Sequence, residues 1–96
     1  MEVGRTETRW APNAAARVHS SGVPFVVDIV WIENISSHGA RIRGQRAWKP
    51  QDHMVLTRLL GDVQVGAKVI YCQRLGVSEC AIGLKFDHPV VPEQLA

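Results

Sequence analysis

The chain has 96 residues, of which 46% are hydrophobic and 21% are charged, and its formal net charge is +2. This length fits one domain with an apolar core, and the composition is typical of a soluble folded protein and disfavours a disordered chain. No segment approaches the roughly 20 consecutive apolar residues of a membrane-spanning helix, and the first residues lack the apolar core of a secretion signal. We therefore expect a cytoplasmic protein without a membrane span. The small net charge does not by itself indicate a nucleic-acid partner.

Residues 1–13 contain only two large apolar side chains, Val3 and Trp10, together with Arg5 and Arg9. Such a segment has too little apolar surface to offset its conformational entropy, so we expect a mobile N-terminal arm. The two arginines lie four residues apart. About 0.6 pairs with this spacing are expected by chance, so the spacing alone carries little weight.

Two strands are predicted next, a weak one over 14–18 and a longer one over 23–35 that is rich in β-branched and aromatic residues. Strict alternation divides the longer strand into two faces. One face holds Phe25, Val27, Ile29, Trp31 and Ile35, and the other holds Val26, Asp28, Val30, Ile32 and Asn34. Both faces are partly apolar, which is typical of a strand in a barrel or in a covered sheet.

The segment Asn34 to Gly39 matches the pattern Asp/Asn-x-Ser-x-x-Gly, for which about 0.02 chance matches are expected in this composition. Short polar side chains here can bond to nearby backbone or to a ligand, and Gly39 permits a close backbone approach. After the glycine, Arg41 and Arg43 are predicted to point outward together. No acidic residue lies between Asn34 and Gln51, so this region favours an anionic partner.

The second half of the chain also has the pattern of strands and turns. A connection over 44–52 leads to a strand over 54–60 and a turn at 61–62, and strict alternation from Val63 to Cys72 predicts the next strand. A loop over 73–79 and a strand over 81–86 follow, with Gly83 and Lys85 directed outward. Two prolines limit residues 87–96 to a short helical turn. The sequence thus predicts an all-β fold, a small six-stranded antiparallel β-barrel.

Motifs of known catalytic or metal chemistry are missing from the sequence. The two cysteines, Cys72 and Cys80, bracket a predicted hairpin, and in the cytoplasm we expect them to be free thiols. The four histidines are scattered without metal-ligand spacing, and there is neither a Gly-x-Ser-x-Gly motif nor a phosphate-binding glycine loop. We expect no enzyme activity, no metal and no cofactor, although a catalytic triad assembled in space is not excluded by sequence.

Three motifs in order resemble those of the PilZ family. Arg5-Thr6-Glu7-Thr8-Arg9 matches Arg-x-x-x-Arg, 24 residues separate Arg9 from the Asn34 to Gly39 motif, and Ile82-Gly83-Leu84-Lys85-Phe86 looks like the closing strand of PilZ domains. The resemblance covers nearly the whole chain. It implies a bacterial signalling receptor that binds the second messenger cyclic di-GMP without catalysing a reaction. It also implies three parts: an N-terminal ligand-binding arm over 1–13, a PilZ-like β-barrel over 14–88 and a C-terminal tail over 89–96.

The resemblance assigns ligand binding to Arg5, Arg9, Asn34, Ser36 and Gly39. Arginine suits this ligand because its planar fork can grip a phosphate or the O6/N7 edge of guanine. Family members often carry a further arginine before the first motif residue, where this chain has Gly4, so the number of bound ligands stays open. Three other cations, Arg41, Arg43 and Lys85, either lend charge to the site or lie on a solvated barrel face.

Two alternatives remain, a PilZ-like protein-interaction module without nucleotide affinity and a small oligonucleotide-binding barrel. The presence of both binding motifs favours the receptor over the interaction module. The low aromatic content, 6%, disfavours a nucleic-acid partner, because such barrels stack bases on aromatic side chains. We expect the receptor to pass its signal to an unidentified downstream protein by direct contact.

Overall fold

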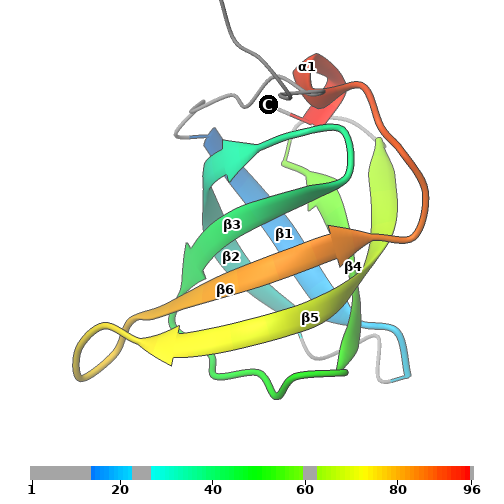
Figure 1. Cartoon of the computed structure of the whole chain (residues 1–96). Helices are drawn as coiled ribbons and strands as arrows, with labels where there is room; N and C mark the ends of the chain where they lie inside the picture. Colours follow the sequence, from blue (N-terminus) through cyan, green and yellow to red (C-terminus); the bar gives the residue numbers. More distant parts are fainter. Residues whose placement is uncertain (1–13, 23–26, 60–62, 96) are drawn as a thin grey trace, which may run out of the picture.

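A computed structural model gives the fold and describes residues 14–22, 27–59 and 63–95. These ranges contain six strands and one helix: β1 (Ala14–Ser20), β2 (Val27–Ile35), β3 (Gly39–Gly44), β4 (His53–Arg58), β5 (Gln64–Arg74), β6 (Cys80–Phe86) and α1 (Pro92–Leu95). All strand pairs are antiparallel, and the order β1-β2-β3-β6-β5-β4 closes into a barrel (Figure 1). The predicted all-β barrel and the short C-terminal helical turn are confirmed.

The core fills the barrel with side chains from all six strands. Its largest fully buried members include Val18, Val30, Ile32, Ile42, Met54, Leu56, Val69 and Ile82. The two ends of the barrel are covered by segments outside the sheet, α1 at one end and the connection between β3 and β4 at the other (Figure 1). Leu95 and Trp48 from these segments are buried in the same core. Barrel closure and end covers together remove apolar surface from water.

The alternation predicted for β2 is wrong at its C-terminal end. The pairing of β2 with β3 shifts register between Ile32 and Asn34, which marks a β-bulge. A bulge inserts one residue and changes the phase of the strand, so Ile35 joins Val30 and Ile32 in the core instead of sharing a face with Trp31. Trp31 is left on the outside of the barrel.

A second irregularity changes the outward face of β5. The pairing with β6 shifts register between Val69 and Tyr71. Val69 is fully buried, whereas Tyr71 is 40% exposed, so the two residues do not share a face as strict alternation predicts. The bulge places the tyrosine ring on the outer surface of the barrel.

The two cysteines are free thiols, as predicted. Cys72 pairs with Ile82 and Cys80 with Arg74, so the cysteines lie diagonally across the β5–β6 ladder. Burial raises the pKa of the Cys80 thiol, and the nearby Cys72 thiol raises it further. A raised pKa keeps the thiol protonated, so Cys80 has little nucleophilic character at neutral pH.

Several predictions fall outside the described residues. These are the N-terminal arm over 1–13 with Arg5 and Arg9, the start of the long strand over 23–26 and the turn at 61–62. In the described ranges, no helix has the length and apolar content needed to cross a membrane.

Gly39 lies at a point where β3 passes very close to the backbone of β6. It is the partner of Lys85 in the ladder, and a Cβ added to it would overlap the backbone carbonyl oxygen of Leu84. A carbonyl within a strand cannot rotate away as a flexible side chain can. The glycine of the Asp/Asn-x-Ser-x-x-Gly pattern is therefore required by strand packing in this fold.

We predict that Gly39→Ala lowers the free energy of unfolding by roughly 1–3 kcal/mol, as overpacking against fixed backbone usually does. Chemical denaturation measures this change. Gly22→Ala is the matched control, because a Cβ at Gly22 meets nothing within 4 Å, and it should change stability by less than about 0.5 kcal/mol. Equal stability of the two variants would contradict the close approach of β3 to β6.

Candidate ligand-binding site

The turn between β2 and β3 is held together by Ser36. Its backbone N–H donates to the carbonyl of Gly39 at 2.8 Å, its hydroxyl donates to the same oxygen at 3.4 Å, and it accepts from the His38 N–H at 3.4 Å. The Ser36 residue is only 3% exposed. Local side-chain bonds of this kind are the reason serine is favoured in turns. The structure thus gives Ser36 a turn-forming role, and direct contact with a ligand stays a prediction.

The same turn is fastened to the far end of the chain. The Phe86 N–H donates to the carbonyl of His38, and the Val90 N–H donates to the carbonyl of Ser37, both at 2.8 Å. These bonds tie the β2–β3 turn to the end of β6 and to the segment before α1. The turn is consequently fixed against the barrel wall.

Beside this turn lies an open hollow of about 390 Å³ on the outer surface of the barrel. The residues that line it include Asn34, Ser36, Gly39, Arg41, Tyr71 and Lys85. The three described residues of the Asn34 to Gly39 motif are therefore brought together, and two cations and an aromatic ring from β3, β5 and β6 join them. Arg43 points outward as predicted but lines a different hollow.

Tyr71 forms one wall of this hollow because the opposite residue is a glycine. Gly83 is its partner across the β5–β6 ladder, and a Cβ added to Gly83 would overlap the Tyr71 ring. The ring therefore occupies the space that a side chain at Gly83 would fill. Its hydroxyl accepts a hydrogen bond from Nη1 of Arg41 at 3.2 Å, which holds ring and guanidinium together.

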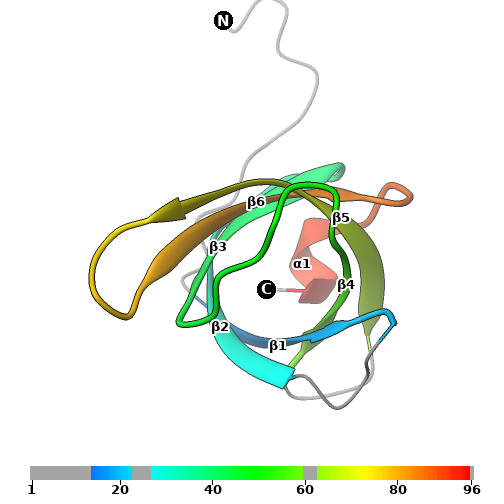
Figure 2. The ribbon, with the colours of Figure 1, turned by 90° about the horizontal axis from the view of Figure 1, so that it is seen from below.

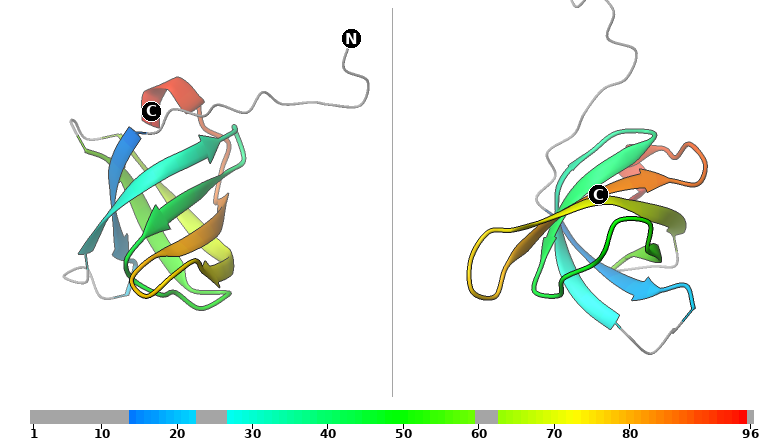
Figure 3. Two further views of the ribbon diagram at one scale, coloured as in Figure 1. Left: turned by 90° about the vertical axis from the view of Figure 1, so that its left-hand side faces the viewer. Right: turned by 60° about the horizontal axis from the view of Figure 1, so that its bottom comes forward.

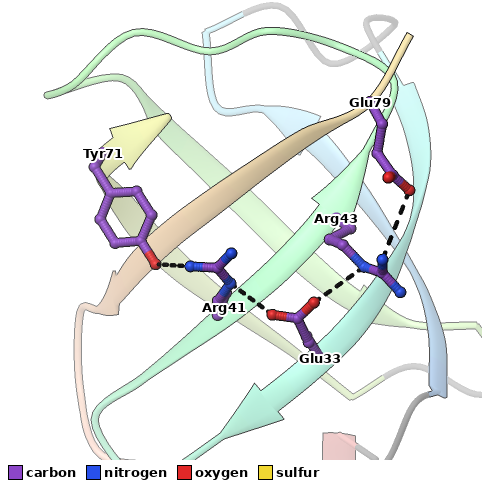
Figure 4. A network of polar contacts seen from close by, with 5 residues as sticks. All are labelled: Glu33, Arg41, Arg43, Tyr71 and Glu79. Carbon is purple, nitrogen blue, oxygen red and sulfur yellow. Dashed lines mark hydrogen bonds and ion pairs between the residues drawn. The ribbon is translucent and has the colours of Figure 1, made fainter. Parts of the chain in front are cut away.

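Arg41 belongs to a chain of polar contacts that crosses β3 (Figure 4). Its Nε donates to Oε1 of Glu33 at 2.5 Å, and Oε2 of the same carboxylate lies 3.1 Å from Nε of Arg43. Nη1 of Arg43 lies 3.9 Å from Oε2 of Glu79. These side chains are a third to a half exposed, so each ion pair contributes little to stability. Their effect is to position the two guanidinium groups.

The hydrogen bond to Tyr71 raises the pKa of Arg41 above its ordinary value, and Glu33 acts in the same direction against partial desolvation. The guanidinium is therefore a permanent positive charge at the hollow. It has five N–H donors, and the two bonds to Glu33 and Tyr71 leave further donors for an anion.

A second polar chain joins Ser21, His53 and Asp87 elsewhere on the barrel. The Ser21 hydroxyl lies 2.9 Å from Nδ1 of His53, and Nε2 of His53 lies 2.9 Å from Oδ1 of Asp87. Serine, histidine and aspartate follow one another as in a catalytic triad, but the side chains of His53 and Asp87 are nearly half exposed to water. Acyl transfer relies on preorganised donors in a site that excludes water. We therefore interpret this chain as a surface link between the end of β1, β4 and the residue after β6.

Sequence motifs alone do not single out Tyr71 or Glu33. The available signal for Tyr71 was its position as the single tyrosine of the chain, opposite a glycine in a predicted hairpin. The bulge that turns it outward has no sequence signature of its own. Among the described residues, no cluster of three or more His, Cys, Asp or Glu side chains is placed to hold a metal ion.

Comparisons with protein-family models, curated proteins and solved structures each found no match.

We predict that Gly83→Ala displaces the Tyr71 ring and removes its bond to Arg41, with little effect on stability, because the obstructing group is a half-exposed side chain. The emission of the three tryptophans masks that of the tyrosine, so fluorescence is not a suitable measurement. The aromatic NMR signal of the chain's single tyrosine is measured instead. That signal should move while the melting temperature changes by less than a few degrees. An unchanged tyrosine signal would contradict the contact between the ring and Gly83.

Proposed function

We propose that the chain is a bacterial receptor for cyclic di-GMP, which binds in the hollow beside the β2–β3 turn. The observation that carries this proposal is the convergence of Asn34, Ser36 and Gly39 with Arg41, Tyr71 and Lys85 around one open hollow. The motif residues are near one another in sequence, but the cation on β6 and the ring on β5 come from distant segments. The proposal assigns the protein the role of a sensor and not of a catalyst.

The chemistry of the lining fits a ligand with two phosphates and two guanines. Arg41 and Lys85 supply positive charge for phosphate oxygens, and the arginine fork can also recognise the O6/N7 edge of guanine. The exposed ring of Tyr71 offers a stacking surface, and base–aromatic stacking is worth about 1–3 kcal/mol per base. Asn34 adds an amide with both donors and an acceptor. In this arrangement Ser36 and Gly39 set the backbone shape of the turn at the edge of the site.

Arg5 and Arg9 are proposed to complete the site from the N-terminal arm. The described chain begins at Ala14, which is the partner of Ile32 on β2, two residues before Asn34. Arg9 is five residues from Ala14, a length of chain that spans at most about 17 Å when extended. We propose that Arg9 reaches the hollow over this length, and that the signal of ligand binding passes to a downstream protein through the ordered arm and the surface beside it.

We predict that calorimetric titration detects binding of cyclic di-GMP in preference to GTP, GMP and cyclic AMP. At about 100 times its Kd, the ligand should stabilise the fold by roughly 2.7 kcal/mol, which a thermal shift also detects. Absence of both heat and thermal shift would reject the receptor and favour the protein-interaction module. Comparable binding of unrelated single-stranded oligonucleotides would instead favour the oligonucleotide-binding barrel.

Two variants of β3 distinguish binding at a specific site from attraction to overall positive charge. Arg41→Ala is expected to weaken cyclic di-GMP binding by about tenfold to a hundredfold, which corresponds to about 1.4–2.8 kcal/mol. Arg43→Ala removes the same charge two residues away, from a side chain that contacts the same Glu33 but lines another hollow, and should change affinity by less than about threefold. Equal losses in the two variants would show that the ligand responds to net charge and not to this hollow.

Variants of the arm provide an independent measurement. Arg5→Ala and Arg9→Ala should each weaken binding by roughly tenfold to a hundredfold, while the melting temperature without ligand stays unchanged. An arginine that acts only in the bound state has this signature. A fall in the ligand-free melting temperature would mean that the arm is part of the folded barrel.

A further inference from the structure

An apolar stripe runs along the outer face of β2. Val27, Ile29 and Trp31 alternate along the strand and are 51%, 52% and 50% exposed. Up to the bulge beyond Ile32, the strand alternates regularly and turns its other face to the core, so these three side chains point outward. Three large apolar side chains in a row on one outer face are a common feature of interaction surfaces.

A second apolar feature lies at the tip of the hairpin between β5 and β6, residues 75–79, which we call the hairpin tip. The hairpin projects well beyond the wall of the barrel (Figures 2 and 3). Its tip carries Leu75, which is 43% exposed, and Val77, which is 97% exposed. Burial of this nearly fully exposed valine against another surface would be favourable, because it removes apolar surface from water.

The hairpin tip has a defined shape in the free chain. The Leu75 N–H donates to the Glu79 carbonyl at 2.8 Å, and Nη1 of Arg74 donates to the Val77 carbonyl at 3.1 Å. The Arg43–Glu79 ion pair joins the base of the tip to β3. A surface that already has its binding shape loses less conformational entropy on association.

Stripe and hairpin enclose a hollow of about 740 Å³, distinct from the one proposed for cyclic di-GMP. Its lining includes Val27, Ile29, Trp31, Arg43, Ser78 and Glu79. One side of this hollow is therefore the stripe, and the other is the hairpin of the same chain. Such a concave space open to solvent is shaped to receive a narrow projecting element.

Charge around the two features is complementary. Arg17 of β1, the partner of Ile29, is an exposed cation beside the stripe, whereas Arg43 of β3 already contacts Glu33 and Glu79 of its own chain. The hairpin tip carries the carboxylate of Glu79 beside its apolar residues. An apolar tip with a half-exposed carboxylate thus matches an apolar stripe with the exposed Arg17 at its edge.

We propose that two copies of this chain form a two-fold symmetric dimer in which the hairpin tip of each copy packs on the β2 stripe of the other. A two-fold axis makes the contact reciprocal, so the tip-to-stripe contact occurs twice and no unpaired end remains. The second copy is the occupant because both halves of the contact are present on one chain. The surface is separate from the cyclic di-GMP site, and the dimer does not depend on that ligand.

The test is the association state of the whole chain without nucleotide, measured by sedimentation velocity up to about 100 µM, where a micromolar Kd gives mostly dimer. The wild-type chain should be dimeric. Ile29→Lys and Val77→Glu should each weaken dimerisation by about a hundredfold, since symmetry repeats each change at both contacts. Val91→Glu places the same charge on a half-exposed valine outside both features and should leave the dimer intact.

The decisive measurement uses a mixture of the two variants. A heterodimer of the Ile29→Lys chain and the Val77→Glu chain has one lysine–glutamate contact and one unchanged apolar contact, so the mixture should recover dimers that neither variant forms alone. Circular dichroism confirms that both variants are folded. A monomeric wild-type chain, dimers that persist in either variant, or a mixture that stays monomeric would each overturn the proposed contact.

Discussion

The pairing of β3 with β6 is the constraint on which the rest of this structure depends. These strands are distant in sequence, and their ladder closes the barrel with Gly39 opposite Lys85 and Arg41 opposite Gly83. Side chains at Gly39 and Gly83 would collide with the Leu84 carbonyl and with the Tyr71 ring. Gly39 thus lets β3 lie close to β6, and Gly83 leaves room for the Tyr71 ring of β5. That approach brings a motif on the β2–β3 turn beside residues of β5 and β6, and the hollow results from this junction.

The outer face of β3 divides the surface into two regions with different chemistry. Arg41 faces a hollow with polar and aromatic walls, whereas Arg43 lies at the edge of an apolar stripe on β2. One carboxylate, Glu33, contacts both arginines and bridges them across the strand. Because these ion pairs are partly exposed, they add little to the free energy of unfolding, and their value lies in geometry. The proposed anionic ligand and the proposed apolar partner surface would therefore use neighbouring but separate faces of the same strands.

The fold class could be predicted from sequence because strand periodicity and turn residues are local signals. Alternation around Val65, Ala67 and Val69 and the glycines between strands were enough for an antiparallel barrel. The faces of β2 and β5 could not be predicted fully, because a bulge changes the phase of a strand without a marker in its sequence, which affected Ile35 and Tyr71. The motif from Asn34 to Gly39 located half of the candidate site. Tyr71 and Glu33 were missed because their proximity to Arg41 follows from tertiary pairing and from the bulge.

The central claim is that cyclic di-GMP occupies the hollow at the β3–β6 junction. Backbone amide NMR spectra recorded during a titration with this nucleotide test it most directly. The account predicts that the largest shifts belong to Asn34, Gly39, Arg41, Tyr71 and Lys85, while the amides of Ile29 and Val77 stay unchanged. Shifts centred on the β2 stripe and the β5–β6 hairpin, or no shifts at saturating nucleotide, would contradict it.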